Sequence, residues 1–116
     1  METRDLLELS LSALNEVKGK DICCLEVGEL TDLTDFMVIV TGNTIRQVRA
    51  LADGLVLSAK KNGVKILGVE GYGEANWTLV DLGDLVVHIM LPEARKFYDL
   101  EKLWAIDLRA DTEQDC

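Results

Sequence analysis

The chemically most varied residues of this chain lie close together, between Val69 and Trp104. This stretch holds both tryptophans, both tyrosines, the only histidine and the only proline. Its rings and its thioether could supply buried contact area, and its carboxylates could pair with lysine or arginine on a partner. A structural alternative stays open, because a histidine can pack against a neighbouring indole and aspartates are common solvated turn residues. The groups in question are Glu70, Trp77, Asp81, Asp84, His88, Met90 and Tyr98.

Two β-prone runs, Asn76–Val80 and Leu85–Leu91, predict a hairpin in this stretch. A two-residue turn at Leu82-Gly83 would place Trp77 opposite His88. Because side chains alternate across a strand, one face is mixed and the other is aliphatic and should join the core. The mixed face suits a partner surface, so we expect Trp77→Ala to weaken docking while leaving the fold intact. The mixed face carries Trp77, Leu79, Asp81, Asp84, Val86, His88 and Met90, and the aliphatic face carries Thr78, Val80, Leu85, Val87, Ile89 and Leu91.

The only proline, followed by an acidic residue, predicts a helix that begins directly after the hairpin. Phe97, Leu100 and Trp104 share one side of this helix, and the last two are expected to seal the core. Arg95 and Tyr98 are left near the end of the hairpin. They belong either to the partner surface or to a plain helix surface or dimer contact.

Composition excludes several function classes. The chain has 116 residues, 48% of them hydrophobic, which is enough for one domain with a real core. A net charge of −9 argues against direct, nonspecific binding to nucleic acid, although an acidic protein can dock on a basic protein within a ribonucleoprotein.

Three cysteines without framework spacing and one histidine without a CxxC pair predict neither a disulfide scaffold nor a zinc site. Because we find no signal peptide and no apolar run of membrane-spanning length, we expect a cytoplasmic location.

Hydrophobic periodicity predicts the elements that must position these residues. The continuous apolar run Phe36–Val40 is typical of a strand buried on both faces and central in its sheet. Thr44 with Gln47 three residues later fits a capping box, which starts a helix that continues to Lys60. The other predicted elements are a helix at Arg4–Lys18 and strands at Asp21–Val27 and Lys65–Val69.

The resulting order, α-β-β-α-β-β-β-α, predicts a single α/β (α+β) domain with a mixed five-stranded sheet. A strand–helix–strand succession favours one parallel pair, and the hairpin adds antiparallel neighbours. Helices should cover much of one sheet face and leave part of the other free. We place the domain at residues 1–104 and expect residues 105–116 to form a polar, acidic and disordered tail.

Several separate motifs, in this order along residues 5–104, resemble the ribosomal silencing factor family, also called the Iojap or RsfS family. The first half of the match consists of Asp21-Ile22, the run from Leu33 to Gly42, and Arg46-Gln47-Val48. The second half consists of Glu70-Gly71, Trp77, Asp81-Leu82-Gly83-Asp84, Val87-His88, Pro92-Glu93, Arg95, the run from Phe97 to Glu101, and Leu103-Trp104.

The resemblance implies a nucleotidyltransferase-like fold without the enzyme's chemistry and without a cofactor. It also implies a plug that binds large ribosomal subunit protein fourteen on the 50S subunit and blocks joining of the 30S subunit, and it implies a homodimer. Ribosomal proteins are generally basic, so an acidic partner is electrostatically apt. The expected docking residues are Glu70, Trp77, Asp81, Asp84, His88, Met90, Arg95 and Tyr98.

Two other functions stay open. A nucleotidyltransferase would need two or three converging carboxylates for magnesium and a glycine motif for phosphates. The turn Thr41-Gly42-Asn43-Thr44 precedes a helix N-terminus that could hold a phosphate, but it has one glycine and no Walker lysine, so an ordinary strand-to-helix connection is favoured. The other possibility is a general dimeric adaptor for a different protein.

Overall fold

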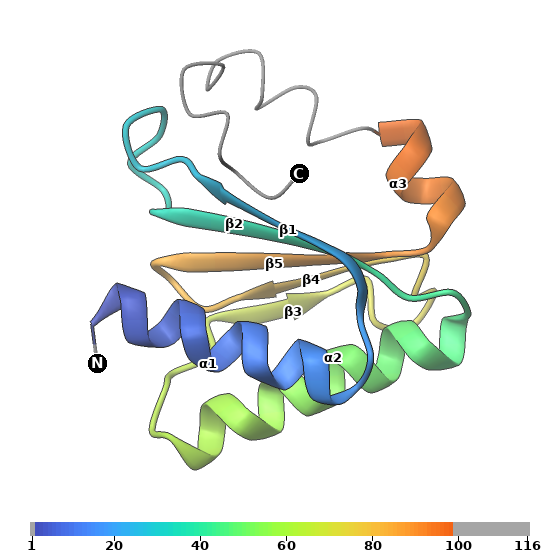
Figure 1. The fold of residues 1–116 in the computed structure, drawn as a ribbon, viewed down its shortest axis with the longest axis horizontal. Helices are drawn as coiled ribbons and strands as arrows, with labels where there is room; N and C mark the ends of the chain where they lie inside the picture. Colours follow the sequence, from blue (N-terminus) through green and yellow to red (C-terminus); the bar gives the residue numbers. More distant parts are fainter. Residues whose placement is uncertain (1, 99–116) are drawn as a thin grey trace.

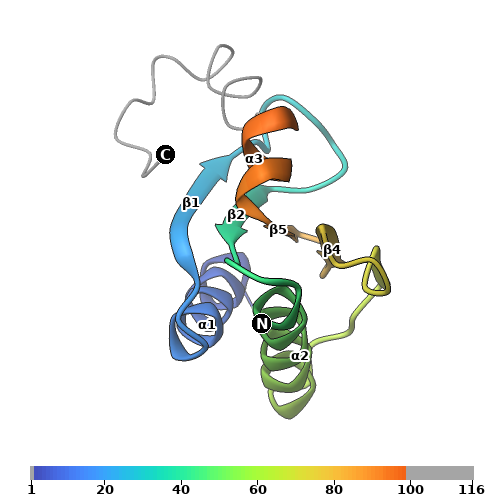
Figure 2. The same cartoon turned by 90° about the vertical axis from the view of Figure 1, so that its right-hand side faces the viewer.

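The computed structural model describes residues 2–98, which form three layers. The elements are α1 (Thr3–Glu16), β1 (Lys20–Glu26), β2 (Phe36–Thr41), α2 (Ile45–Lys61), β3 (Gly68–Glu70), β4 (Trp77–Asp81), β5 (Leu85–Met90) and α3 (Pro92–Tyr98). Helices α1 and α2 lie on one side of the sheet and α3 lies on the other (Figures 1 and 2). The predicted fold class and order of elements are confirmed. The predicted continuation of the last helix to Trp104 and the tail at residues 105–116 lie outside the described residues.

Strand β2 lies inside the sheet, as its uninterrupted apolar sequence predicts. The strand order is β1-β2-β5-β4-β3, and β2 with β5 forms the single parallel pair among the described strands. Val38 and Val40 point to the face covered by α1 and α2, whereas Met37 and Ile39 point to the opposite face. The strand predicted at Lys65–Val69 is shorter than expected, because its ladder with β4 begins only at Gly68.

The sheet separates two hydrophobic clusters of different size. The larger one, here called the helix-side core, packs α1 and α2 against the sheet and includes Leu14, Val38, Val40, Leu51, Leu55, Val87 and Ile89. The smaller one, here called the second core, contains Cys23, Leu25, Val27, Met37, Ile39, Met90 and Ala94, with Trp77 packed against it. Each fully buried aliphatic side chain stabilises the fold by about 1.5–3 kcal/mol. Among the described residues, β4 contributes Trp77 to the second core and β3 contributes none, so the opposite face is least covered at these two strands.

The hairpin register differs from the prediction by two residues. Trp77 pairs with Met90 rather than with His88. The backbone N–H of Leu82 donates to the carbonyl of Leu85 at 2.9 Å, so the two central turn residues are Gly83-Asp84 rather than Leu82-Gly83. Gly83 has a φ of +90°, which suits the first central position of a type II′ hairpin turn. A shift of two residues preserves the side-chain alternation, so both predicted faces are correct for the residues that lie in the strands.

Ser10 is a fully buried residue of α1 whose hydroxyl has no hydrogen-bond partner among the described residues. A buried hydroxyl without a partner costs about 1–3 kcal/mol, so Ser10→Ala is expected to raise the free energy of unfolding by about 1 kcal/mol. Ser12→Ala, at an exposed position of the same helix, is the matched control for helix propensity. Urea unfolding followed by circular dichroism measures both variants. Equal gains would show that propensity, and not the buried hydroxyl, is responsible.

Candidate docking surface

Most of the predicted site residues share the sheet face opposite α1 and α2. In the antiparallel ladders Glu70 pairs with Leu79, and Leu79 pairs with His88. Directly paired residues point to the same face, so this face crosses three strands. Asp84 is the exception among the hairpin residues, because it lies in the turn. The members on the strands are Glu70, Trp77, Leu79, Asp81, Val86, His88 and Met90.

A row of rings joins β5 to α3. The indole N–H of half-buried Trp77 donates to Nδ1 of His88 at 2.9 Å. The Tyr98 ring lies 4.5 Å from the Trp77 ring, and the Phe97 ring meets Tyr98 edge-on at 4.9 Å. Exposure falls along this row from 80% at Phe97 through 47% at Tyr98 to 6% at His88. Tyr98 and Phe97 therefore form an exposed aromatic surface, and the half-buried Trp77 ring packs against Tyr98.

His88 and Met90 do not reach the surface, which corrects the prediction that they contact a partner directly. Met90 is fully buried in the second core, and His88 is held by Trp77. Burial lowers the pKa of His88 to about 4 from its ordinary value of 6.5. The imidazole is therefore neutral near pH 7, with Nδ1 accepting the indole hydrogen and the ring proton on Nε2. The structural alternative for His88 is the one that the geometry supports.

Helix α3 is attached to the sheet at several points. Ala94 enters the second core, and Nη1 of half-buried Arg95 donates to Oγ1 of Thr41 at 2.8 Å. This contact joins α3 to the end of β2, so Arg95 fixes the position of the helix that carries Tyr98. Beside it lies a pocket of about 420 Å³, lined by Asn76, Leu91, Glu93, Ala94, Phe97 and Tyr98. Its aromatic walls and single carboxylate suit a long cationic side chain.

The two turn aspartates lie at the opposite end of the hairpin from Trp77. Oδ1 of Asp81 accepts the backbone N–H of Gly83 at 2.9 Å, as an aspartate that stabilises its own turn does. Asp84 is exposed and accepts a long hydrogen bond of 3.4 Å from Oγ1 of Thr3. The predicted site is therefore divided into an aromatic end and an acidic end, with Leu79 and Val86 half-buried between them.

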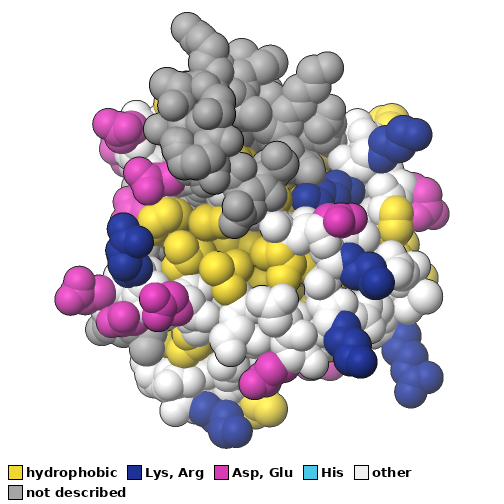
Figure 3. Space-filling view, viewed as in Figure 1, with side chains coloured by type: hydrophobic (Ala, Val, Ile, Leu, Met, Phe, Trp, Pro, Cys, Tyr) yellow, Lys and Arg dark blue, Asp and Glu magenta, His cyan; other side chains and the backbone are white. Residues whose placement is uncertain are grey.

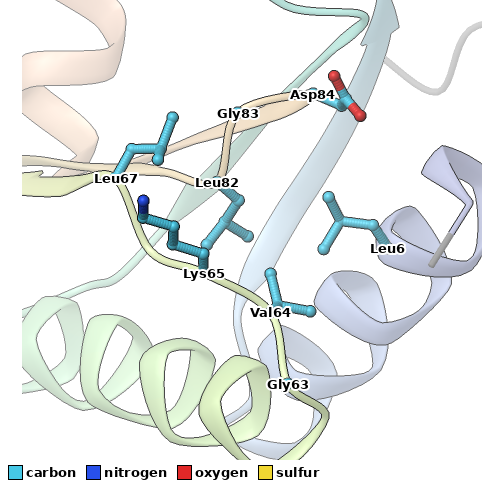
Figure 4. Close-up of a pocket in the computed structure, with 8 residues that line it drawn as sticks. All are labelled: Leu6, Gly63, Val64, Lys65, Leu67, Leu82, Gly83 and Asp84. Atoms are coloured by element: carbon cyan, nitrogen blue, oxygen red, sulfur yellow. The ribbon is translucent and has the colours of Figure 1, made fainter.

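A second pocket, of about 300 Å³, opens at the acidic end. In Figure 4 the side chains of Leu6, Val64 and Leu82 point toward one another, with Asp84 at the rim. Leu67 points away from them and is 57% exposed. Leu6 of α1 lines this pocket together with Leu82, Gly83 and Asp84, so the first turns of α1 lie beside the hairpin turn.

The charge of the chain is unevenly distributed over the side of the molecule shown in Figure 3. Asp and Glu side chains gather toward the end where α1 begins, and Lys and Arg side chains toward the end where α2 begins. Hydrophobic side chains are exposed between the two.

The loop between Glu70 and Trp77 is held by two residues of α2, Arg49 and Asp53, to which the sequence analysis assigned no role. Arg49 on α2 donates from Nε to the carbonyl of Tyr72 at 3.2 Å, and it also donates to the carbonyl of Gly73. The hydroxyl of Tyr72 donates to Oδ2 of Asp53 at 3.1 Å. The signal that could have indicated this contact is the (i, i+4) spacing of Arg49 and Asp53 on one helix side.

The turn at Thr41–Thr44 uses its backbone donors within the chain. The N–H of Gly42 donates to the carbonyl of Met90 at 3.0 Å, and Oγ1 of Thr44 accepts the N–H of Gln47 at 3.1 Å, which is the predicted helix cap. These bonds fit an ordinary strand-to-helix connection. Within residues 2–98, no three His, Cys, Asp or Glu side chains converge on a possible metal position. None of the described helices is long and apolar enough to cross a membrane.

Comparison with known proteins gives a consistent result. A family model described as "Ribosomal silencing factor during starvation" matches residues 1–116. A ribosomal silencing factor from Chromobacterium violaceum is 46% identical over 90% of this chain and 85% of its own length. A crystal structure of a protein from the same organism superposes with a TM-score of 0.89 at 46% identity, covering 90% of this chain and 88% of that one. A mouse protein named "Mitochondrial assembly of ribosomal large subunit protein 1" is 34% identical over 86% of this chain and 45% of its own length.

Proposed function

Because this chain belongs to the ribosomal silencing factor family, we propose that it docks on large ribosomal subunit protein fourteen and keeps the 30S subunit from joining the 50S subunit. Silencing of the ribosome is the activity that the family description names. The name of the mouse relative refers to the large subunit, which supports that choice of subunit. The block is steric, since a folded domain seated on the intersubunit face occupies the space that the small subunit needs.

The observation that carries the proposal is an exposed aromatic and apolar strip with carboxylates at its edges. Tyr98 and Phe97 are exposed at one end, and half-buried Leu79 continues the strip across β4. Glu70 is exposed beside this strip, and Asp81 lies half-exposed on the same face. Large aromatic anchors with carboxylates at the edge of the surface fit the recognition of a basic protein.

The structure changes the choice of test residue. Trp77 packs against the second core and satisfies Nδ1 of His88, so Trp77→Ala would weaken the fold as well as docking. We therefore replace the expectation that Trp77→Ala leaves the fold intact with the expectation that it weakens the fold. Glu70 is exposed at the edge of the sheet, which makes it the cleaner position for a change of charge.

Glu70→Lys is expected to weaken binding to 50S subunits about tenfold, because a like charge then faces the basic partner. Glu8→Lys makes the same change in net charge at an exposed position of α1, on the other side of the sheet, and is the matched control. Binding is measured by cosedimentation with purified 50S subunits. The block is measured separately, by light scattering after 30S subunits and magnesium are added.

Each outcome of this experiment separates one part of the proposal. Equal weakening by Glu70→Lys and Glu8→Lys would show that only net charge matters and that the docking face is elsewhere. Normal 70S formation in the presence of bound wild-type protein would contradict the proposed block of subunit joining but not the proposed docking.

We also propose a cytoplasmic location and a homodimer of the free protein. Sedimentation equilibrium of the free chain tests the dimer.

A further inference from the structure

The loop at residues 71–76 joins two members of the candidate docking surface that come from different strands. Glu70 ends β3 and Trp77 begins β4, so the path of the loop sets the position of one relative to the other. The loop is bent, with φ values of +79° at Gly71 and +58° at Ala75. Ala75 is fully buried in the helix-side core, so the loop is anchored at that residue.

A second attachment comes from α2, on the other side of the sheet. The guanidinium of Arg49 donates to two successive backbone carbonyls, those of Tyr72 and Gly73, and its carbon lies 5.7 Å from the centre of the Tyr72 ring. The Tyr72 hydroxyl donates to Asp53, one turn further along α2. The loop is thus held through its backbone and through its only aromatic side chain.

Two adjacent carbonyls require two N–H donors in a fixed relative geometry. The planar fork of arginine supplies this arrangement, whereas the single ammonium of lysine does not. Arg49 is half-buried, and Tyr72 and Asp53 are exposed, so these bonds add little to global stability. Their main effect is to restrict a glycine-containing loop, which would otherwise lose conformational freedom when a partner binds.

We propose that Arg49 is a positioning residue for docking: it preorders the loop at residues 71–76 and thereby holds Glu70 and Trp77 in their relative positions. This inference rests on the proposed function, because it assigns to Arg49 a role in presenting the same surface. Arg49 acts through the loop backbone and does not itself contact the partner.

The test compares Arg49→Gln, Arg49→Lys and the control Arg46→Gln. Arg46 is exposed one turn earlier on α2. Affinity for 50S subunits is measured for each variant over a series of salt concentrations. Amide hydrogen exchange of residues 71–76 and the midpoint of thermal unfolding are measured on the free proteins.

The expected result is about fivefold weaker 50S binding for both Arg49 variants, with faster exchange in the loop and an unchanged unfolding midpoint. The dependence of affinity on salt should keep its wild-type slope, because no contact to the partner is lost. Full recovery by Arg49→Lys, or a slope reduced by about one, would overturn the inference and make Arg49 a direct charge contact. Wild-type affinity in Arg49→Gln would also overturn it. Failure of the wild-type protein to bind would instead contradict the proposed function, and the inference with it.

Discussion

Acidification from about pH 7 to about pH 4 is expected to destabilise this protein by about 3 kcal/mol more than its His88→Gln variant. Burial lowers the pKa of His88 to about 4, compared with an ordinary value of 6.5 in the unfolded chain. Between these two values the unfolded chain binds a proton that the folded protein does not. Stability is therefore lost progressively as the pH falls from about 6.5 to about 4, and this contribution is constant below that range.

The comparison isolates His88 because the chain has only one histidine. Glutamine can accept the hydrogen bond from the indole of Trp77 but does not titrate, so the remaining pH dependence of the variant comes from other groups. Urea unfolding at a series of pH values gives the free energy of unfolding for both proteins. Parallel curves between pH 6.5 and 4 would contradict the prediction and would mean that the folded protein accommodates the imidazolium, for example by turning the ring away from Trp77.

This pair of residues also shows what periodicity can and cannot predict. Alternation along the two hairpin strands was enough to place Trp77 and His88 on one face, because the side-chain period of a strand is two. The alternation could not decide which two residues lie at the centre of the turn. Placing Gly83 first rather than second in the turn moves the register by two residues, and the difference depends on a backbone conformation that the sequence does not state. Direct opposition of the two rings was therefore wrong, although their contact was right.

The burial of a side chain was harder to predict than the face of the sheet on which it lies. Met90 and His88 lie on the predicted mixed face, yet α3 and the pairing of β5 with β2 place them under other residues. The alternation of side chains within the hairpin does not show which other elements pack on its faces. The packing of one parallel neighbour and one short helix decides which members of the face remain exposed. The same reasoning explains why Glu70, on the three-residue strand β3, keeps its exposure.

The contact between α2 and the loop at residues 71–76 could not be derived from local pattern. Arg49 and Tyr72 are 23 residues apart, and they meet only because the chain crosses from β2 to the far edge strand β3. The sequence predicted one parallel pair after a crossover, but it did not say that β4 and β5 would return between β3 and β2. Long-range contacts of surface side chains depend on that choice of strand order.

Gly71→Ala is expected to lower the free energy of unfolding by about 2–3 kcal/mol. Gly71 has a φ of +79°, a conformation that costs little for glycine and strains any other residue. An added Cβ would also lie 2.2 Å from the carbonyl oxygen of Trp77, which is backbone and cannot move aside as a flexible side chain does. Gly73→Ala is the matched control two residues later, because a Cβ there has nothing within 4 Å. The control is expected to stay within about 0.5 kcal/mol of the wild-type protein.

Gly71→Ala is also expected to weaken docking, because the added methyl group meets the carbonyl oxygen of Trp77. The carbonyl of Trp77 belongs to the first residue of β4, so relief of the clash moves either the loop or the start of that strand. Either movement changes the position of Trp77 relative to Glu70, so 50S binding should fall even at temperatures where the variant is fully folded. A folded Gly71→Ala protein that binds like Gly73→Ala would show that docking tolerates displacement of this loop. That result would remove the main reason for an arginine on α2 to hold it.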